Sequence, residues 1–180
     1  MGERFKSHTM TVLSNAVNRL GDNHDEVRNL SQSVLLKLMH INTPQSVWDR
    51  LMTGFSHKLW RVREETLICL QQTIEMYGAK CLSLSKLVGA IVKLLDDPNR
   101  QVSDQAMNTL VDIYCNVGER VRMDISKKGL SPQLLHTVMD KFDKARSLGR
   151  MRIDSAGSTE LSSDWQFPPP YGNDEALDAK

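Results

Sequence analysis

A short stretch of the sequence, GFSHKLWRVREE at residues 54–65, gathers side chains that could bind an acidic partner. It contains basic or potentially basic groups around one tryptophan: His57, Lys58, Trp60, Arg61 and Arg63. If the stretch begins a helix, its charges are poorly placed, because a first helical turn has unpaired N–H groups and favours Asp or Glu. Each cation there costs up to about 1 kcal/mol. A partner or a structural carboxylate must offset this cost.

The stretch belongs to an internal repeat. Three segments align on an anchor valine: LGDNHDEV ending at Val27, FSHKLWRV ending at Val62 and LDDPNRQV ending at Val102. The anchors stand about 35 to 40 residues apart, a period typical of helical solenoids. A small residue follows each valine at the fourth position and a leucine at the eighth, which places all three on one helix face.

Helical periodicity is found both before and after each of these loops, and no run alternates as a half-buried strand does. Pro44 and Pro98 each follow a capping residue, as at helix starts, and Gly78 and Gly118 suit helix ends. The sequence therefore predicts an all-α fold, a HEAT-repeat solenoid of about three helix pairs. Residues 132–146, PQLLHTVMDKFDKAR, are expected to form a capping helix at its C-terminal end.

Two regions are predicted from composition. Residues 1–146 form the helical repeat domain, in which Lys and Arg outnumber Asp and Glu. Residues 147–180 are acidic and rich in Ser, Gly and Pro, as in a disordered tail or linker. The aromatic residues Trp165, Phe167 and Tyr171 in this tail are either a short docking motif or incidental.

Several classes of function are not supported by the sequence. The histidines have no metal-ligand spacing, and no phosphate-binding glycine loop or nucleophile elbow occurs, so we expect no enzyme, no metal and no cofactor. The near balance of basic and acidic residues argues against nucleic-acid binding. Glu3, Arg4 and Lys6 stand where a signal peptide would be apolar, and no window is long enough to span a membrane. These features predict a cytoplasmic protein.

The repeat separates structural charges from functional ones. Arg28 and Arg63 each directly follow an anchor valine, and we interpret them as structural links to a carboxylate of a neighbouring repeat. Lys58, Arg61 and Arg100 fall in successive loops, where no packing rule of the repeat requires them. Along one edge of a solenoid they would form a basic stripe, which either binds an acidic macromolecule or is merely solvated.

Longer runs carry a more specific resemblance. RFKSHTMTVLSNAVNRLGDNHDEVRN, VWDRLMTGFSHKLWRVREE, LLDDPNRQVSDQAMNTLVDIYCNVGERVR and ISKKGL resemble the N-terminal TOG domain of the CLASP family, in particular its C-terminal half. The resemblance implies HEAT-like units whose internal loops bind tubulin. It also implies microtubules as partner, with plus-end or kinetochore proteins as further partners, and a location on microtubules, the spindle and the kinetochore.

The resemblance carries tubulin contacts over to specific loop positions, and the basic stretch adds Trp60. The expected tubulin-binding residues are Asn23, His24, Lys58, Trp60, Arg61, Asn99 and Arg100. The function expected is a non-catalytic microtubule-binding module that regulates plus-end dynamics and spindle or kinetochore attachment. The alternative is a general HEAT-repeat adaptor that docks another protein on its helix face and does not bind tubulin.

Overall fold

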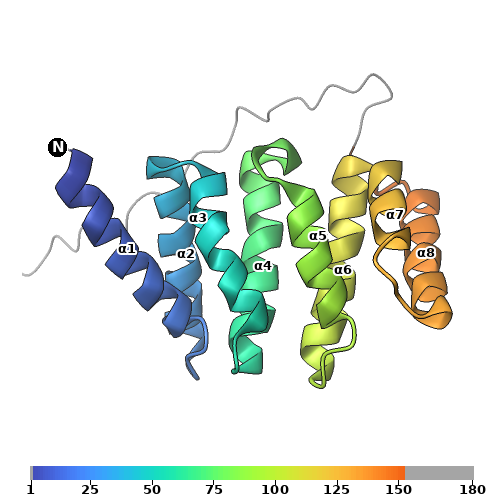
Figure 1. The fold of residues 1–180 in the computed structure, drawn as a ribbon, viewed down its shortest axis with the longest axis horizontal. Helices are drawn as coiled ribbons and strands as arrows, with labels where there is room; N and C mark the ends of the chain where they lie inside the picture. Colours follow the sequence, from blue (N-terminus) through green and yellow to red (C-terminus); the bar gives the residue numbers. More distant parts are fainter. Residues whose placement is uncertain (1, 153–180) are drawn as a thin grey trace, which may run out of the picture.

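The chain forms a row of α-helices arranged in two layers (Figure 1). The computed structural model describes residues 2–152, with side chains from His8 onward, and that part of the chain contains no strand. The elements in chain order are α1 (Gly2–Arg19), α2 (Asp25–Ile41), α3 (Pro44–Leu51), the 3-10 turn η1 (Met52–Ser56), α4 (Trp60–Tyr77), the 3-10 turn η2 (Ala79–Cys81), α5 (Leu84–Leu94), α6 (Arg100–Val117), α7 (Glu119–Ser126) and α8 (Pro132–Ser147).

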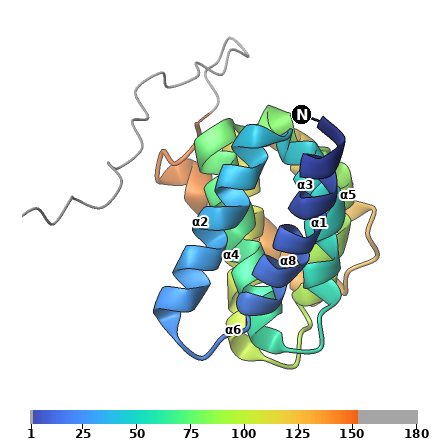
Figure 2. The same ribbon diagram turned by 90° about the vertical axis from the view of Figure 1, so that its left-hand side faces the viewer.

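Consecutive helices pack in pairs, α1 with α2, α3 with α4, α5 with α6 and α7 with α8. Helices α2, α4, α6 and α8 stack on one another in one layer, and α1, α3, α5 and α7 form the other (Figure 2). The predicted all-α solenoid of HEAT type is therefore confirmed. The predicted capping helix is present as α8, but it pairs with α7, a helix that sequence reasoning did not find. The described chain thus has four helix pairs.

The start predicted at Pro44 and both predicted stops are confirmed. The Thr43 side chain caps α3, and Pro44 occupies its first turn. The start predicted at Pro98 is wrong by two residues, because Asn99 caps the helix and α6 begins at Arg100. Gly78 and Gly118 end α4 and α6 with a φ of 78°, a conformation that any side chain would strain. These local signals fix where each loop begins, and so place the loops at common edges of the solenoid.

The repeat register marks the core. Val62 and Val102 are fully buried, as are the leucines eight positions after the anchors, Leu35, Leu70 and Leu110. The small residues four positions after the anchors, Ser31, Thr66 and Ala106, are also buried. Small side chains there let neighbouring helices approach closely. The periodicity read from the sequence is therefore the periodicity of one continuous apolar core.

The structured region continues beyond the expected boundary at residue 146. Helix α8 ends at Ser147, and Gly149, with a φ of 69°, turns the chain back toward the fold. Met151 packs against the core, and the Arg152 N–H donates to the carbonyl of Cys115 at 2.8 Å. The remainder of the predicted tail, residues 153–180, lies outside the described residues.

Candidate protein-binding edge

The loops inside the first three helix pairs lie at one edge of the solenoid, at the lower side of Figure 1. We call this surface the loop edge and define it as residues 21–24, 57–61 and 96–100. The loops are joined to one another by side chains rather than standing apart. The contacts that join them explain most of the charges whose placement the sequence left unexplained.

Arg63 ties the second loop to the third. Its Nε and Nη2 donate to the two carboxylate oxygens of Asp97 at 2.7 and 2.9 Å, and both side chains are largely buried. Its Nη1 also donates to the carbonyls of His57 and Lys58 at 2.7 and 3.2 Å. Burial alone would raise the pKa of Asp97, but the hydrogen bonds from Arg63 and from the Asn99 N–H, with the Arg63 charge, lower it.

Arg28 repeats this arrangement one unit earlier. Its Nε donates to Glu65 Oε1 of α4 at 2.8 Å, and its Nη1 donates to the carbonyl of Asp22 at 2.8 Å. It also pairs with Asp25, and Gln32 binds the second oxygen of Glu65. Each arginine thus holds the carbonyl six residues before it and a carboxylate of the next helix pair. Both occupy the position that follows the anchor valine, as in the structural role predicted for them.

Arg61 and Trp60 also connect the loops. The Arg61 Nη1 lies 3.4 Å from both the Asp22 carbonyl and Asn23 Oδ1 of the first loop. Its guanidinium lies over the Trp60 ring, 5.1 Å from the ring centre, and Trp60 is half-buried against the core. Arg61 is therefore less free than the sequence suggested, because one face of it is already used to bridge two loops.

Lys58 and Arg100 are the more exposed cations of the predicted set. The Arg100 side chain is 92% exposed, and its ion pair is an exposed one with Asp104 at 3.5 Å. Such a pair stabilises a helix by only a few tenths of a kcal/mol. Lys58 is exposed as well. These two side chains can reach a partner without breaking a buried ion pair such as that of Arg63 with Asp97.

Sequence reasoning missed Leu59, which lies between Lys58 and Trp60. It is 48% exposed, although its position in the loop would allow a polar residue. Its Cδ1 lies close enough to Gly21 that a Cβ there would meet it at 3.2 Å, so it also packs across the first two loops. The available signal was an apolar side chain outside the helical register, in a loop that also contains Lys58 and Arg61. Leu59 adds an apolar contact at the centre of the edge.

The remaining predicted residues have structural partners. Asn99 caps α6, and His24 Nδ1 lies 3.0 Å from Asp22 Oδ1. Hydrogen bonds from the backbone and ring of His24, followed by one from Arg19, lower the pKa of Asp22 to about 2. The first loop therefore carries an ionised acid at neutral pH. The exposed Lys58 and Arg100 thus lie on the second and third loops, and the third loop also carries the exposed Asp96.

The described residues hold no cluster of three or more His, Cys, Asp or Glu side chains suited to a metal ion. Over the same residues, 2–152, no helix combines the length and the apolar character needed to cross a membrane. The loop edge itself offers the exposed cations Lys58 and Arg100, the exposed Leu59 and a backbone held in place by the largely buried ion pairs of Arg28 and Arg63.

A row of helix pairs whose internal loops share one edge defines a helical repeat protein of the HEAT type. The chain belongs to the XMAP215/Dis1/CLASP TOG domain family, whose model matches residues 3–142. CLIP-associating protein 1 of Xenopus tropicalis is 48% identical over 155 residues, which cover 86% of this chain. CLIP-associating protein of Drosophila melanogaster is 37% identical over 153 residues, or 83% of this chain.

Solved structures agree with this assignment. The MAST/Orbit N-terminal domain superposes with a TM-score of 0.76 at 36% identity, covering 82% of this chain and 66% of that one. A structure from a study of TOG–tubulin binding specificity superposes with a TM-score of 0.65 at 25% identity, covering 72% of this chain and 48% of that one. The chain spans only 11% of the length of the Xenopus tropicalis relative.

Proposed function

We propose that this chain is a non-catalytic module that binds tubulin through the loop edge and thereby regulates microtubule dynamics. The observation that carries the proposal is the rigid presentation of Lys58, Leu59 and Arg100 on loops joined by the Arg63–Asp97 ion pair. A surface held in place before binding loses less conformational freedom on association. The similarity to a TOG domain studied for its tubulin-binding specificity supports the choice of tubulin as the partner.

The proposed contact set keeps the residues expected from the sequence and orders them. Lys58, Arg100 and Leu59 contact the partner directly. The loop contacts come from Arg61, Trp60, Asn23, His24 and Asn99. Those of them with exposed atoms also contact the partner at the periphery of the interface. Arg28 and Arg63 hold the loops in position. Action at plus ends, on the spindle and at kinetochores, and a cytoplasmic location on microtubules, belong to the same proposal.

Electrostatic attraction at such an edge has a measurable consequence. The exposed cations would steer an acidic partner and set the association rate, so binding should weaken as salt rises. The test is co-sedimentation of the chain with microtubules, and gel filtration with free tubulin, at low and physiological salt. Binding that falls as salt rises supports the proposal. No binding to either form of tubulin at low salt would favour the general adaptor instead.

A further inference from the structure

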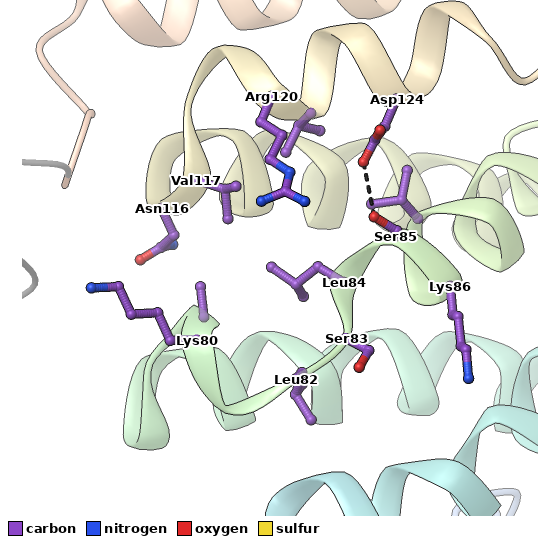
Figure 3. A pocket seen from close by; sticks show the side chains of 13 residues that line it. Lys80, Leu82, Ser83, Leu84, Ser85, Lys86, Asn116, Val117, Arg120 and Asp124 are labelled. Atoms are coloured by element: carbon purple, nitrogen blue, oxygen red, sulfur yellow. Dashed lines mark hydrogen bonds between the residues drawn. The ribbon is translucent and has the colours of Figure 1, made fainter. Parts of the chain in front are cut away.

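A second surface lies at the opposite end of the helices from the loop edge. The turn between α4 and α5 and the turn between α6 and α7 enclose a hollow of about 630 Å³, which we call the turn hollow (Figure 3). Leu82, Leu84, Val88, Val117 and Val121 form its apolar lining. The volume falls within the range of sites that hold a side chain or a small ligand.

The polar groups of the turn hollow are mostly basic. Lys80 and Arg120 extend into it from opposite walls, with the Asn116 amide beside Lys80, whereas Lys86 points away (Figure 3). Asp124 is the one carboxylate among the described residues that line it, and it accepts a hydrogen bond from Ser85 at 3.1 Å. The hollow therefore matches a segment with an apolar anchor and negative charge.

The described chain ends beside this hollow. The Arg152 N–H donates to the carbonyl of Cys115 at 2.8 Å, and the next residue of α6, Asn116, lines the hollow. The sequence that follows is acidic and contains aromatic side chains. Its charged residues are Asp154, Glu160, Asp164, Asp174, Glu175, Asp178 and Lys180. Trp165 directly follows Asp164, and Phe167 comes two residues after Trp165.

We propose that the segment Asp164–Phe167 docks into the turn hollow of its own chain, with an aromatic ring on the apolar lining and Asp164 facing Lys80 and Arg120. The linker is long enough, because the roughly thirteen residues from Arg152 to Trp165 span up to about 43–47 Å when extended. As a flexible chain they would cover about 20 Å. The inference does not depend on tubulin binding, since the hollow and the loop edge lie at opposite ends of the helices.

The tether makes a weak site effective. A short linker gives an effective concentration in the millimolar range. A segment whose affinity for the hollow in trans is only about 100 μM would then be docked in roughly nine of ten molecules. The acidic segment would also be held away from the cations of the loop edge, where it would otherwise compete with an acidic partner.

The test uses the full chain and the indole N–H signals of its tryptophans in ¹⁵N NMR. Trp48 is a built-in reference for the fold, because its buried Nε1–H donates to Thr73 at 3.1 Å. Trp165→Phe assigns the Trp165 signal. We expect that signal to be displaced from its random-coil position, independently of protein concentration, and the amides of Leu84 and Val117 to shift when Trp165 and Phe167 are both replaced by Ala.

Charge reversal separates the specific site from general attraction. Lys80→Glu with Arg120→Glu should lower the ratio of docked to free segment about tenfold and return the Trp165 signal toward its random-coil position. Lys37→Glu with Lys93→Glu, which changes the net charge equally at exposed sites elsewhere, should leave the signal in place. A random-coil Trp165 signal in the wild type overturns the proposal. So does a displacement that depends on concentration, or amide changes at residues 58–61 in place of the hollow.

Discussion

Replacement of Arg63 by Met should lower the stability of the fold more than most single changes at the loop edge. Charged residues near a surface usually contribute little, but Arg63 is largely buried. The Arg63 side chain is 13% exposed and that of Asp97 is 5% exposed. Within residues 8–152, removal of the arginine leaves the buried Asp97 carboxylate with a hydrogen bond from the Asn99 N–H alone. It also frees the carbonyls of His57 and Lys58. The substitution therefore leaves a charge without its ion-pair partner and removes two hydrogen bonds to backbone carbonyls.

The expected magnitude lies between those of surface and fully buried ion pairs. Breaking a buried pair costs about 3–5 kcal/mol, whereas exposed pairs contribute about 0–1 kcal/mol. Because Asp97 can recruit water at the protein edge, we expect a loss of about 3 kcal/mol in the free energy of unfolding. For a domain of this size that lowers Tm by roughly 6–12 °C. Arg100→Met, at an exposed pair, should cost less than about 0.5 kcal/mol.

The pH dependence follows from the lowered pKa of Asp97. A carboxyl whose pKa is lowered by folding stabilises the native state above its unfolded pKa, near 4, and loses that contribution as pH falls through the folded value. Without Arg63, burial acts unopposed and favours the protonated form. The difference in stability between wild type and Arg63→Met should thus be greatest near neutral pH and shrink toward pH 3.

Urea unfolding followed by circular dichroism, at pH 7 and pH 4, measures both effects. A double-mutant cycle with Asp97→Asn should give a coupling energy of about 1.5–3 kcal/mol at pH 7. A cost of Arg63→Met no greater than that of Arg100→Met at pH 7 would refute the structural role of the ion pair. An equal cost at both pH values would refute its electrostatic origin.

Three further outcomes are expected from the packing. Gly54→Ala should destabilise the chain by about 1–3 kcal/mol, because the added Cβ would lie 2.3 Å from Thr66 Oγ1. Gly89→Ala in α5 should be neutral or stabilising by up to about 1 kcal/mol, since the atom nearest to the added Cβ is Lys128 Nζ at 3.5 Å. Thermal unfolding of the two variants compares these effects. Leu30→Glu with Ile41→Glu should reduce concentration-dependent association in sedimentation velocity without lowering Tm, because these α2 side chains are 60% and 58% exposed. Unchanged association would mean that this apolar face does not mediate self-association. Burial raises the pKa of Cys69 to about 12 and that of Cys81 to about 11. Both thiols should therefore react slowly with disulfide reagents at pH 8 in the native protein and rapidly in guanidinium chloride. Fast labelling of Cys69 in the native protein would contradict its burial.

The repeat could be predicted because one local pattern carries it. Val62, Thr66 and Leu70 recur at helical spacing, and each such set faces the same core. The capping residues Thr43 and Asn99 act within their own loops, so their role needs no knowledge of the fold. Helix α7 was missed because its buried side chains are Val121 and Ile125 alone, among charged residues. Too few apolar positions repeat there to give a periodic signal.

The candidate site was predictable in position and less so in role. The repeat alone suggested that Arg63 meets a carboxylate, but the partner, Asp97, lies in another loop and depends on how the helix pairs stack. Arg61 reads as a free cation in the sequence, because its contact with the Asp22 carbonyl involves a backbone atom that leaves no trace in residue type. Leu59 was overlooked since one apolar residue in a loop has no periodicity.

The proposed role of the loop edge in tubulin binding is best tested by comparing two double charge reversals in microtubule co-sedimentation. Lys58→Glu with Arg100→Glu changes the loop edge, and Lys37→Glu with Lys141→Glu makes the same change in net charge on α2 and α8, outside the loop edge. Both variants should unfold within about 2 °C of the wild type, because all four side chains are exposed. We expect the loop-edge variant to lose about tenfold in affinity at physiological salt while the control pair stays within about twofold of the wild type. Equal affinity of the two variants, whether both bind or both fail, would contradict the proposal that the loop edge is the tubulin-binding surface.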